Sequence, residues 1–227
     1  PGQPNSILSS EAAPQIRQVR HLPQQPKSGQ ATVVTAKVTD PDGVSSVELE
    51  YQVVTAGNYI PALLPLSIRD LRRTPDKPRE LNPDYVAAEN WTSLVMVDDG
   101  TQGDSQAGDD IYTATLPGQT HRTLMRYRIQ VTDTGLTSAI VPYEDDASRN
   151  FAYFVYDGVP NYEEHSAETL QSVPVYHLIA RNEDVTTMIA YSSRNQIGQG
   201  IQARFAYNWP STFVYDGMVY DNINMRL

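Results

Sequence analysis

Strict alternation of apolar and polar residues over 46–53 constrains the fold of this chain more than any other feature of its sequence. The stretch SVELEYQV places valine, leucine, tyrosine and valine on one side of an extended chain, and serine, two glutamates and glutamine on the other. A period of two residues is typical of a β-strand with one buried face. The alternation therefore predicts a sheet that covers a core.

Similar patterns predict further strands, and turn sequences separate them. The strands are predicted at residues 16–22, 34–38, 91–97, 110–116, 125–131 and 151–156. The turn sequences are DPDG at 40–43, DDG at 98–100, PG at 117–118 and DTG at 133–135. Short antiparallel strands at this spacing predict a mainly β fold, an immunoglobulin-like or fibronectin-type β-sandwich over residues 16–157.

Two segments depart from this pattern. Residues 1–15 are rich in proline, glutamine and serine and are predicted to be a linker. Residues 61–90 contain five prolines and form a long insertion in the sandwich. We expect this insertion to be a solvated loop with a short helix near 66–73.

The polar side of the strand at 46–53 is predicted to lie beside a basic strand. Arg126 and Arg128 alternate with the apolar residues of 125–131, so both arginines are expected to face outward, near Glu48 and Glu50. Exposed pairs of this kind contribute about 0.2–1 kcal/mol each. We therefore expect them to influence strand register more than stability.

Charge and composition argue against several classes of partner and site. The formal net charge is -10, which repels nucleic acid phosphates and anionic lipid headgroups, so no nucleic-acid partner is expected. The chain has no cysteine and hence no disulfide, thiolate metal site or cysteine nucleophile. No apolar run approaches the roughly 18 residues of a membrane span, so none is predicted.

Residues 158–227 have a different character from the predicted sandwich. A strand is predicted at 173–179 and a short helix at 183–191. Asp216-Gly217 lies between two runs of strand-forming residues, which favours a β-hairpin with a type I′ turn over 213–220. We interpret 158–227 as a partial α+β segment, and the chain as a piece of a longer protein.

Residues 98–110, DDGTQGDSQAGDD, are the most acidic stretch of the chain. The aspartates are Asp98, Asp99, Asp104, Asp109 and Asp110. Their spacing fails the EF-hand pattern, but a loop that folds back on itself could offer these carboxylates to a calcium ion. Aspartate and glycine are also the usual residues of tight turns. The composition favours a double turn, and the five aspartates remain a candidate calcium site.

Other motifs point to no catalytic residue. Residues 198–203 match G-x-G-x-x-A, but antiparallel surroundings favour a loop over a dinucleotide site. The four histidines lie far apart, and no HExxH, G-x-S-x-G or P-loop motif occurs. A carbohydrate-binding module is a further hypothesis, which requires that aromatic residues such as Tyr59, Tyr85 and Trp209 be exposed.

The C-terminal residues carry the most specific resemblance to a known family. Residues 208–227, NWPSTFVYDGMVYDNINMRL, with VPVYHL at 173–178, resemble the start of CotH-type proteins, the spore-coat family of atypical secreted kinases. Upstream, DPDGV at 40–44, MVDDG at 96–100 and NFAYFV at 150–155 resemble the Ig-like domains that precede CotH-like regions in large exported bacterial proteins.

The resemblance implies a function for each segment. It implies that 16–157 is an Ig-like module and that 158–227 is the incomplete N-terminal part of a CotH-like domain. The family's nucleotide- and metal-binding residues are expected beyond the hairpin, so none maps onto this chain. The chain is then a non-catalytic spacer or interaction module of a kinase-like protein that is secreted or displayed on a bacterial surface.

A second hypothesis is structural. An acidic, cysteine-free sandwich could be a subunit or adhesin of a bacterial surface assembly, stabilised by calcium at 98–110. The last predicted strand, Met218–Leu227, would present an open edge, where a protein partner or a second copy could pair. Sequence beyond Leu227 would discriminate between the two hypotheses.

Overall fold

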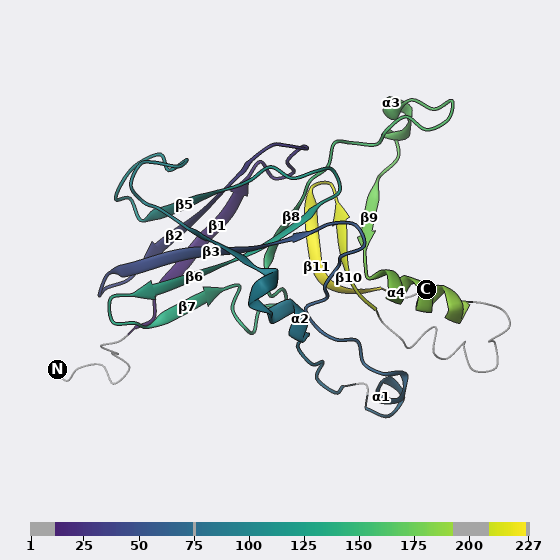
Figure 1. Ribbon diagram of the computed structural model, residues 1–227, viewed down its shortest axis with the longest axis horizontal. Helices are drawn as coiled ribbons and strands as arrows, with labels where there is room; N and C mark the ends of the chain where they lie inside the picture. Colours follow the sequence, from purple (N-terminus) through teal and green to yellow (C-terminus); the bar gives the residue numbers. More distant parts are fainter. Residues whose placement is uncertain (1–11, 75, 193–208, 226–227) are drawn as a thin grey trace, which may run out of the picture.

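The structure is a computed structural model that describes residues 12–74, 76–192 and 209–225. It is mainly β, with antiparallel sheets in a sandwich-like arrangement, as the alternation predicts (Figure 1). One sheet of the sandwich has the order β1-β2-β5, with bounds β1 Gln15–Leu22, β2 Thr32–Thr39 and β5 Ile111–Leu116.

The second sheet of the sandwich has five strands, with the order β4-β3-β6-β7 and β8 also paired to β6. Their bounds are β3 Val44–Val54, β4 Thr92–Val95, β6 Leu124–Asp133, β7 Ser138–Val141 and β8 Phe151–Phe154. The strand β7 was not predicted.

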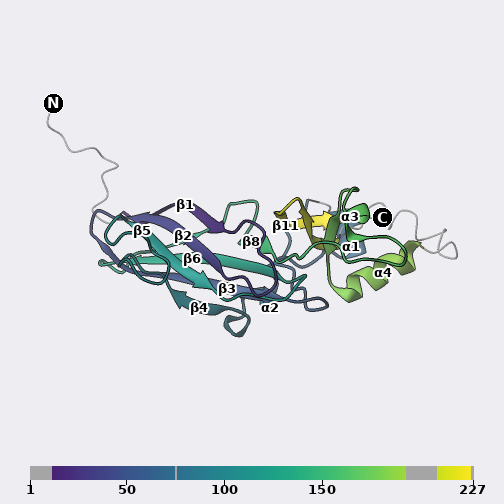
Figure 2. The same cartoon turned by 90° about the horizontal axis from the view of Figure 1, so that it is seen from above.

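A third sheet lies at one end of the sandwich, beside β8 (Figures 1 and 2). Its order is β11-β10-β9, with bounds β9 Tyr176–Ile179, β10 Trp209–Tyr215 and β11 Met218–Met225. The helices are α1 Ile68–Arg73, α2 Pro83–Val86, α3 Ala167–Leu170 and α4 Asn182–Ser192, with a 3-10 turn η1 at Ala88–Asn90. None of the helices in the described ranges is long and apolar enough to cross a membrane.

The main core fills the space between the two sheets of the sandwich. Val47 and Leu49 are buried there, as the alternation predicts. The fully or nearly fully buried partners from other strands include Val34, Ala36, Val38, Leu116, Met125, Tyr127, Ile129 and Val131. Alternate residues of each strand thus meet in one apolar layer.

The predicted alternation reverses at the end of β3. Gln52 is 3% exposed and Val54 is 2% exposed, whereas Val53, predicted to face inward, is 40% exposed. The reason is that the third sheet and the insertion cover the outer face of the sandwich at this end. The prediction assumed that this face was solvated along its whole length.

Part of the insertion is packed, which corrects the prediction of a solvated loop. Ala62, Tyr85 and Trp91 form a small buried cluster, and the rings of Tyr85 and Trp91 meet edge to face at 5.4 Å. The indole Nε1 of Trp91 donates a hydrogen bond to the carbonyl of Tyr85 at 2.6 Å. The ends of the insertion therefore extend the fold, while the segment near α1 is more exposed.

Candidate functional site

The aspartate loop connects β4 to β5, and its own side chains hold its shape. One oxygen of Asp98 accepts hydrogen bonds from the amides of Gly108 (2.7 Å) and Asp109 (3.2 Å), and the other accepts from Asp110 (3.0 Å). Asp98 thus ties the start of the loop to its end. This is the role that the double-turn interpretation assigns to such an aspartate.

Asp104 organises the middle of the loop. Its carboxylate accepts from the amides of Gly100 (2.6 Å) and Gln106 (3.3 Å), and the residue is 8% exposed. Gly103, the residue before Asp104, has a φ of 100°, and a Cβ added there would lie 3.3 Å from the Thr115 hydroxyl. Only glycine fits that backbone conformation without strain.

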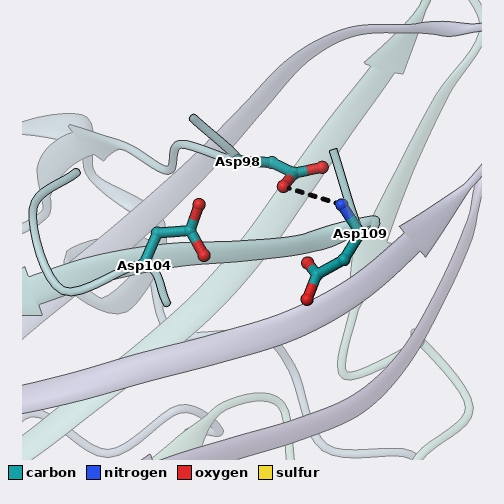
Figure 3. Close-up of side chains that lie close together, drawn as sticks. All are labelled: Asp98, Asp104 and Asp109. Atoms are coloured by element: carbon teal, nitrogen blue, oxygen red, sulfur yellow. Dashed lines mark hydrogen bonds between the residues drawn. The ribbon is translucent and has the colours of Figure 1, made fainter. Parts of the chain in front are cut away.

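Three of the five predicted aspartates converge. Asp98, Asp104 and Asp109 each place a carboxylate oxygen within 4.8 Å of the others, around a common space (Figure 3). Such a group of oxygens is the kind of ligand set that calcium takes. The existing hydrogen bonds use some lone pairs of these carboxylates and leave others for a cation.

The other two aspartates lie outside this group. One oxygen of Asp99 accepts from the Thr101 amide at 2.9 Å and from its hydroxyl at 2.6 Å. The Asp110 carboxylate lies 4.0 Å from the Lys37 ammonium and its side chain is 58% exposed. Among the described residues, three of the five predicted aspartates therefore converge, and calcium binding remains a prediction.

A second polar cluster lies where the hairpin β10–β11 meets the sandwich. Arg126 lies on the outer face of the sandwich, as predicted, but its side chain is wholly buried there, so the prediction that it is exposed is wrong. Its Nε lies 2.7 Å from one oxygen of Asp221, and its Nη2 donates to the other oxygen at 3.0 Å. The Nη2 hydrogen bond and the short ion-pair contact of Nε together hold the guanidinium beside the carboxylate, although Nε itself makes no hydrogen bond.

The sandwich and the insertion supply the remaining contacts of the guanidinium. Its Nη1 donates to the carbonyl of Ile60 at 2.5 Å and to the side-chain oxygen of Gln52 at 3.2 Å. The guanidinium carbon lies 4.8 Å from the ring centre of Tyr59 and 5.8 Å from that of Tyr85. The π-faces of both rings favour a cation at that position.

The carboxylate of Asp221 also accepts hydrogen bonds from several neighbouring residues. It accepts hydrogen bonds from the Thr212 hydroxyl, the Asn150 side-chain amide (2.8 Å) and the Asn222 backbone amide (2.9 Å). Burial alone would raise the pKa of Asp221, but attraction to Arg126 and these hydrogen bonds outweigh burial and hold the pKa below its ordinary value. The pair is therefore ionised at neutral pH.

Apolar contacts surround this ion pair. Val54, Tyr59, Leu124 and Phe154 of the sandwich pack against Val214 of the hairpin in one buried cluster. Partly buried side chains from both sides extend the cluster: Ala152, Tyr156, Ile179 and Val219. The hairpin and the sandwich thus share a small core of their own.

The other sequence hypotheses have different outcomes. Tyr59, Tyr85 and Trp209 are 4%, 2% and 1% exposed, so the carbohydrate-binding hypothesis loses the residues on which it depended. The G-x-G-x-x-A motif at 198–203 lies outside the described residues. His177, on β9, packs its ring against Phe154 at 4.8 Å.

The predicted partner edge is the outer strand of its sheet. β11 pairs with β10 and with no other strand among the described elements. It is not bare, because the Asn222 side chain donates to the Ser148 hydroxyl at 3.4 Å, and Arg79 donates to Asn224. Pairing of this edge with a partner remains a prediction.

Sequence reasoning missed the Arg126–Asp221 pair, although a weak signal exists. Arg126 follows Leu124 on the same side of an extended strand, and Asp221 follows Val219 in the same way. A charged residue on the same side of a strand as an apolar residue, found on two strands with opposite charges, is compatible with a buried ion pair. Alternation alone does not say which strands will meet, since they are 95 residues apart.

No family model matches the chain, and no curated protein matches it.

Proposed function

We propose that this chain is a non-catalytic platform: a sandwich that carries the first sheet of a following CotH-like, kinase-like domain in a protein exported to a bacterial surface. The observation that supports this most directly is the shared core between the hairpin and the sandwich. A simple spacer has no need of a buried interface with the segment that it precedes. The resemblance of 208–227 to CotH-type proteins supplies the identity of the following domain.

The sequence of the parent gene and a nucleotide-binding measurement test this proposal together. If the reading frame continues past Leu227 into a CotH-like region, the extended protein is expected to bind Mg-ATP in isothermal titration calorimetry. The 227-residue chain is expected to show no binding under the same conditions. A frame that closes at Leu227, or an extended protein without nucleotide binding, would contradict the proposal.

A calcium-stabilised structural subunit or adhesin is the second candidate function. The convergence of Asp98, Asp104 and Asp109 favours it, because like charges so close together are relieved by a cation. Pairing through the edge of β11 would then join this chain to a partner or to a second copy.

Calcium binding is tested by the melting temperature. Millimolar calcium is expected to raise it by about 3–8 °C, because a ligand that binds only the folded state stabilises that state. A chelator should reverse the rise, and Asp104→Asn should abolish it. Asp145→Asn, an exposed residue outside the loop, is the control. An unchanged melting temperature in the original chain would refute the calcium site.

A further inference from the structure

We infer that the end of the sandwich is a charge-selective docking surface for the hairpin, and that the Arg126–Asp221 pair decides which face of the hairpin is buried. We define the docking surface as Arg126 with the apolar residues Val54, Tyr59, Leu124 and Phe154. The inference extends the proposed platform role, but it depends only on contacts within the chain. The fitting partner is a β-hairpin with a carboxylate on its inner face.

Hydrophobicity does not explain the orientation of the hairpin. Its outer face is the more aromatic one, with Phe213 and Tyr220 in contact and Tyr215 stacked on Tyr176 of β9. Tyr215 and Tyr220 are 40% and 50% exposed. Apolar burial alone would favour placing these rings against the sandwich, since burial energy grows with apolar area.

The inner face is smaller and more polar. Its residues include Val214 and Val219, together with Thr212 and Asp221. Successive residues of a strand point to opposite faces, so turning the hairpin over would move Asp221 to the solvent side. Of the two faces, only the observed one places the Asp221 carboxylate beside Arg126.

The surroundings of Arg126 in the sandwich make a counterion from the hairpin necessary. The Arg126 guanidinium is already enclosed by Gln52, Ile60 and the rings of Tyr59 and Tyr85. Among the described residues, Asp221 is the only carboxylate that forms an ion pair with it. A buried guanidinium without a counterion is strongly unfavourable. If the hairpin packed through its outer face, Arg126 would be buried without a counterion.

Thiol labelling of single-cysteine variants tests the inference, because the chain has no cysteine of its own. Val214→Cys reports the inner face, where the valine is 1% exposed, and Tyr215→Cys reports the outer face. Val34→Cys, at a position 0% exposed in β2, reports the main core. The labelling rate of each thiol with a maleimide is measured in the full chain.

Breaking the pair is expected to release the hairpin and leave the sandwich folded. Asp221→Asn should raise the labelling rate of the cysteine at 214 by about 100-fold, since removing one partner of a buried pair strongly favours local opening. Arg126→Met should have the same effect. The cysteine at 215 should label readily in every background, and the cysteine at 34 should stay protected.

Glu50→Gln is the matched control. Glu50 on β3 pairs at 2.5 Å with Arg128, which lies on β6 two residues from Arg126, but the pair lies outside the docking surface. This variant should leave the cysteine at 214 protected. Protection of that cysteine in both Asp221→Asn and Arg126→Met would overturn the inference. So would equal exposure in Glu50→Gln, or loss of protection at 34 together with 214. These outcomes are independent of nucleotide binding by the extended protein, which tests the proposed function.

Discussion

At the scale of single residues, two arginines of one strand show how environment decides the role of a charge. Arg126 and Arg128 are both on β6, two positions apart. Arg128 keeps the role predicted for it, pairing with Glu50 while both side chains remain about one fifth exposed. Arg126 is covered by the hairpin and becomes part of a buried ion pair. The difference arises from what packs on each position.

The pH dependence of stability is expected to report the buried pair. The folded-state pKa of Asp221 is lowered, so its contribution is present above the unfolded value of about 3.9 and is lost as the pH falls toward the folded value. At neutral pH, Asp221→Asn should lower the unfolding free energy of the hairpin part, followed by Trp209 fluorescence, by about 3–5 kcal/mol relative to the original chain. Urea unfolding should show this difference shrinking below about pH 4. A difference that stays constant with pH would contradict the assignment.

Asp98 is expected to matter more for stability than its partial exposure suggests. It accepts three backbone hydrogen bonds that close the loop. Asp98→Ala leaves these amides without that acceptor and should cost about 1–3 kcal/mol in urea unfolding. Asp145→Ala, on an exposed loop, should have almost no effect. Equal losses in the two variants would argue against the structural role of Asp98.

At the scale of elements, local chemistry and packing agree in the hairpin. Asp216 and Gly217 have φ values of 50° and 75°, which are the positive values that a type I′ turn requires. The turn was predicted from these two residues and the strand-forming runs on either side of them. The face on which the hairpin rests depends instead on contacts with β6 and the insertion.

Substitutions at Gly217 should test whether the left-handed backbone conformation of the turn limits the stability of the chain. Gly217→Ala places a Cβ on a left-handed residue and should cost about 1–2 kcal/mol of stability. Gly217→Asn should cost less, because asparagine adopts this conformation more readily. Thermal melting of both variants is the measurement. An alanine variant as stable as the asparagine variant would show that backbone conformation is not the limiting factor.

At the scale of the whole molecule, two cores of different size are joined at one surface. The main core lies inside the sandwich, and the smaller one lies between the sandwich and the hairpin. Figure 2 shows the two parts as successive blocks along the long axis of the molecule. The smaller core contains fewer apolar groups and relies on one ion pair, so it is expected to be the weaker of the two.

The two tryptophans should report these two parts separately. Trp91 lies beside the sandwich and Trp209 begins β10. With each tryptophan studied alone, through Trp209→Phe or Trp91→Phe, fluorescence in urea should give coincident midpoints for the otherwise unchanged chain. Adding Asp221→Asn should lower the Trp209 midpoint by about 1 M while leaving the Trp91 midpoint nearly unchanged. Midpoints that move together would show that the parts unfold as one unit.

The sequence alone determined those features that depend on neighbouring residues. Alternation over 46–53 identified a half-buried strand, Asp216-Gly217 identified the turn, and the short helix predicted at 183–191 is found at Asn182–Ser192. Each is controlled by backbone sterics or by a local period, which act over a few residues. The mainly β class follows from these signals.

Only the tertiary structure decided which surfaces meet. It buried Arg126 and Gln52, exposed Val53, packed Tyr85 of the insertion and brought Asp98, Asp104 and Asp109 together. These outcomes depend on segments far apart in the chain, and a period of two residues is the same whether the outer face meets water or another sheet. The burial of a charge is set by the partner that reaches it, and that partner is known only once the chain has folded.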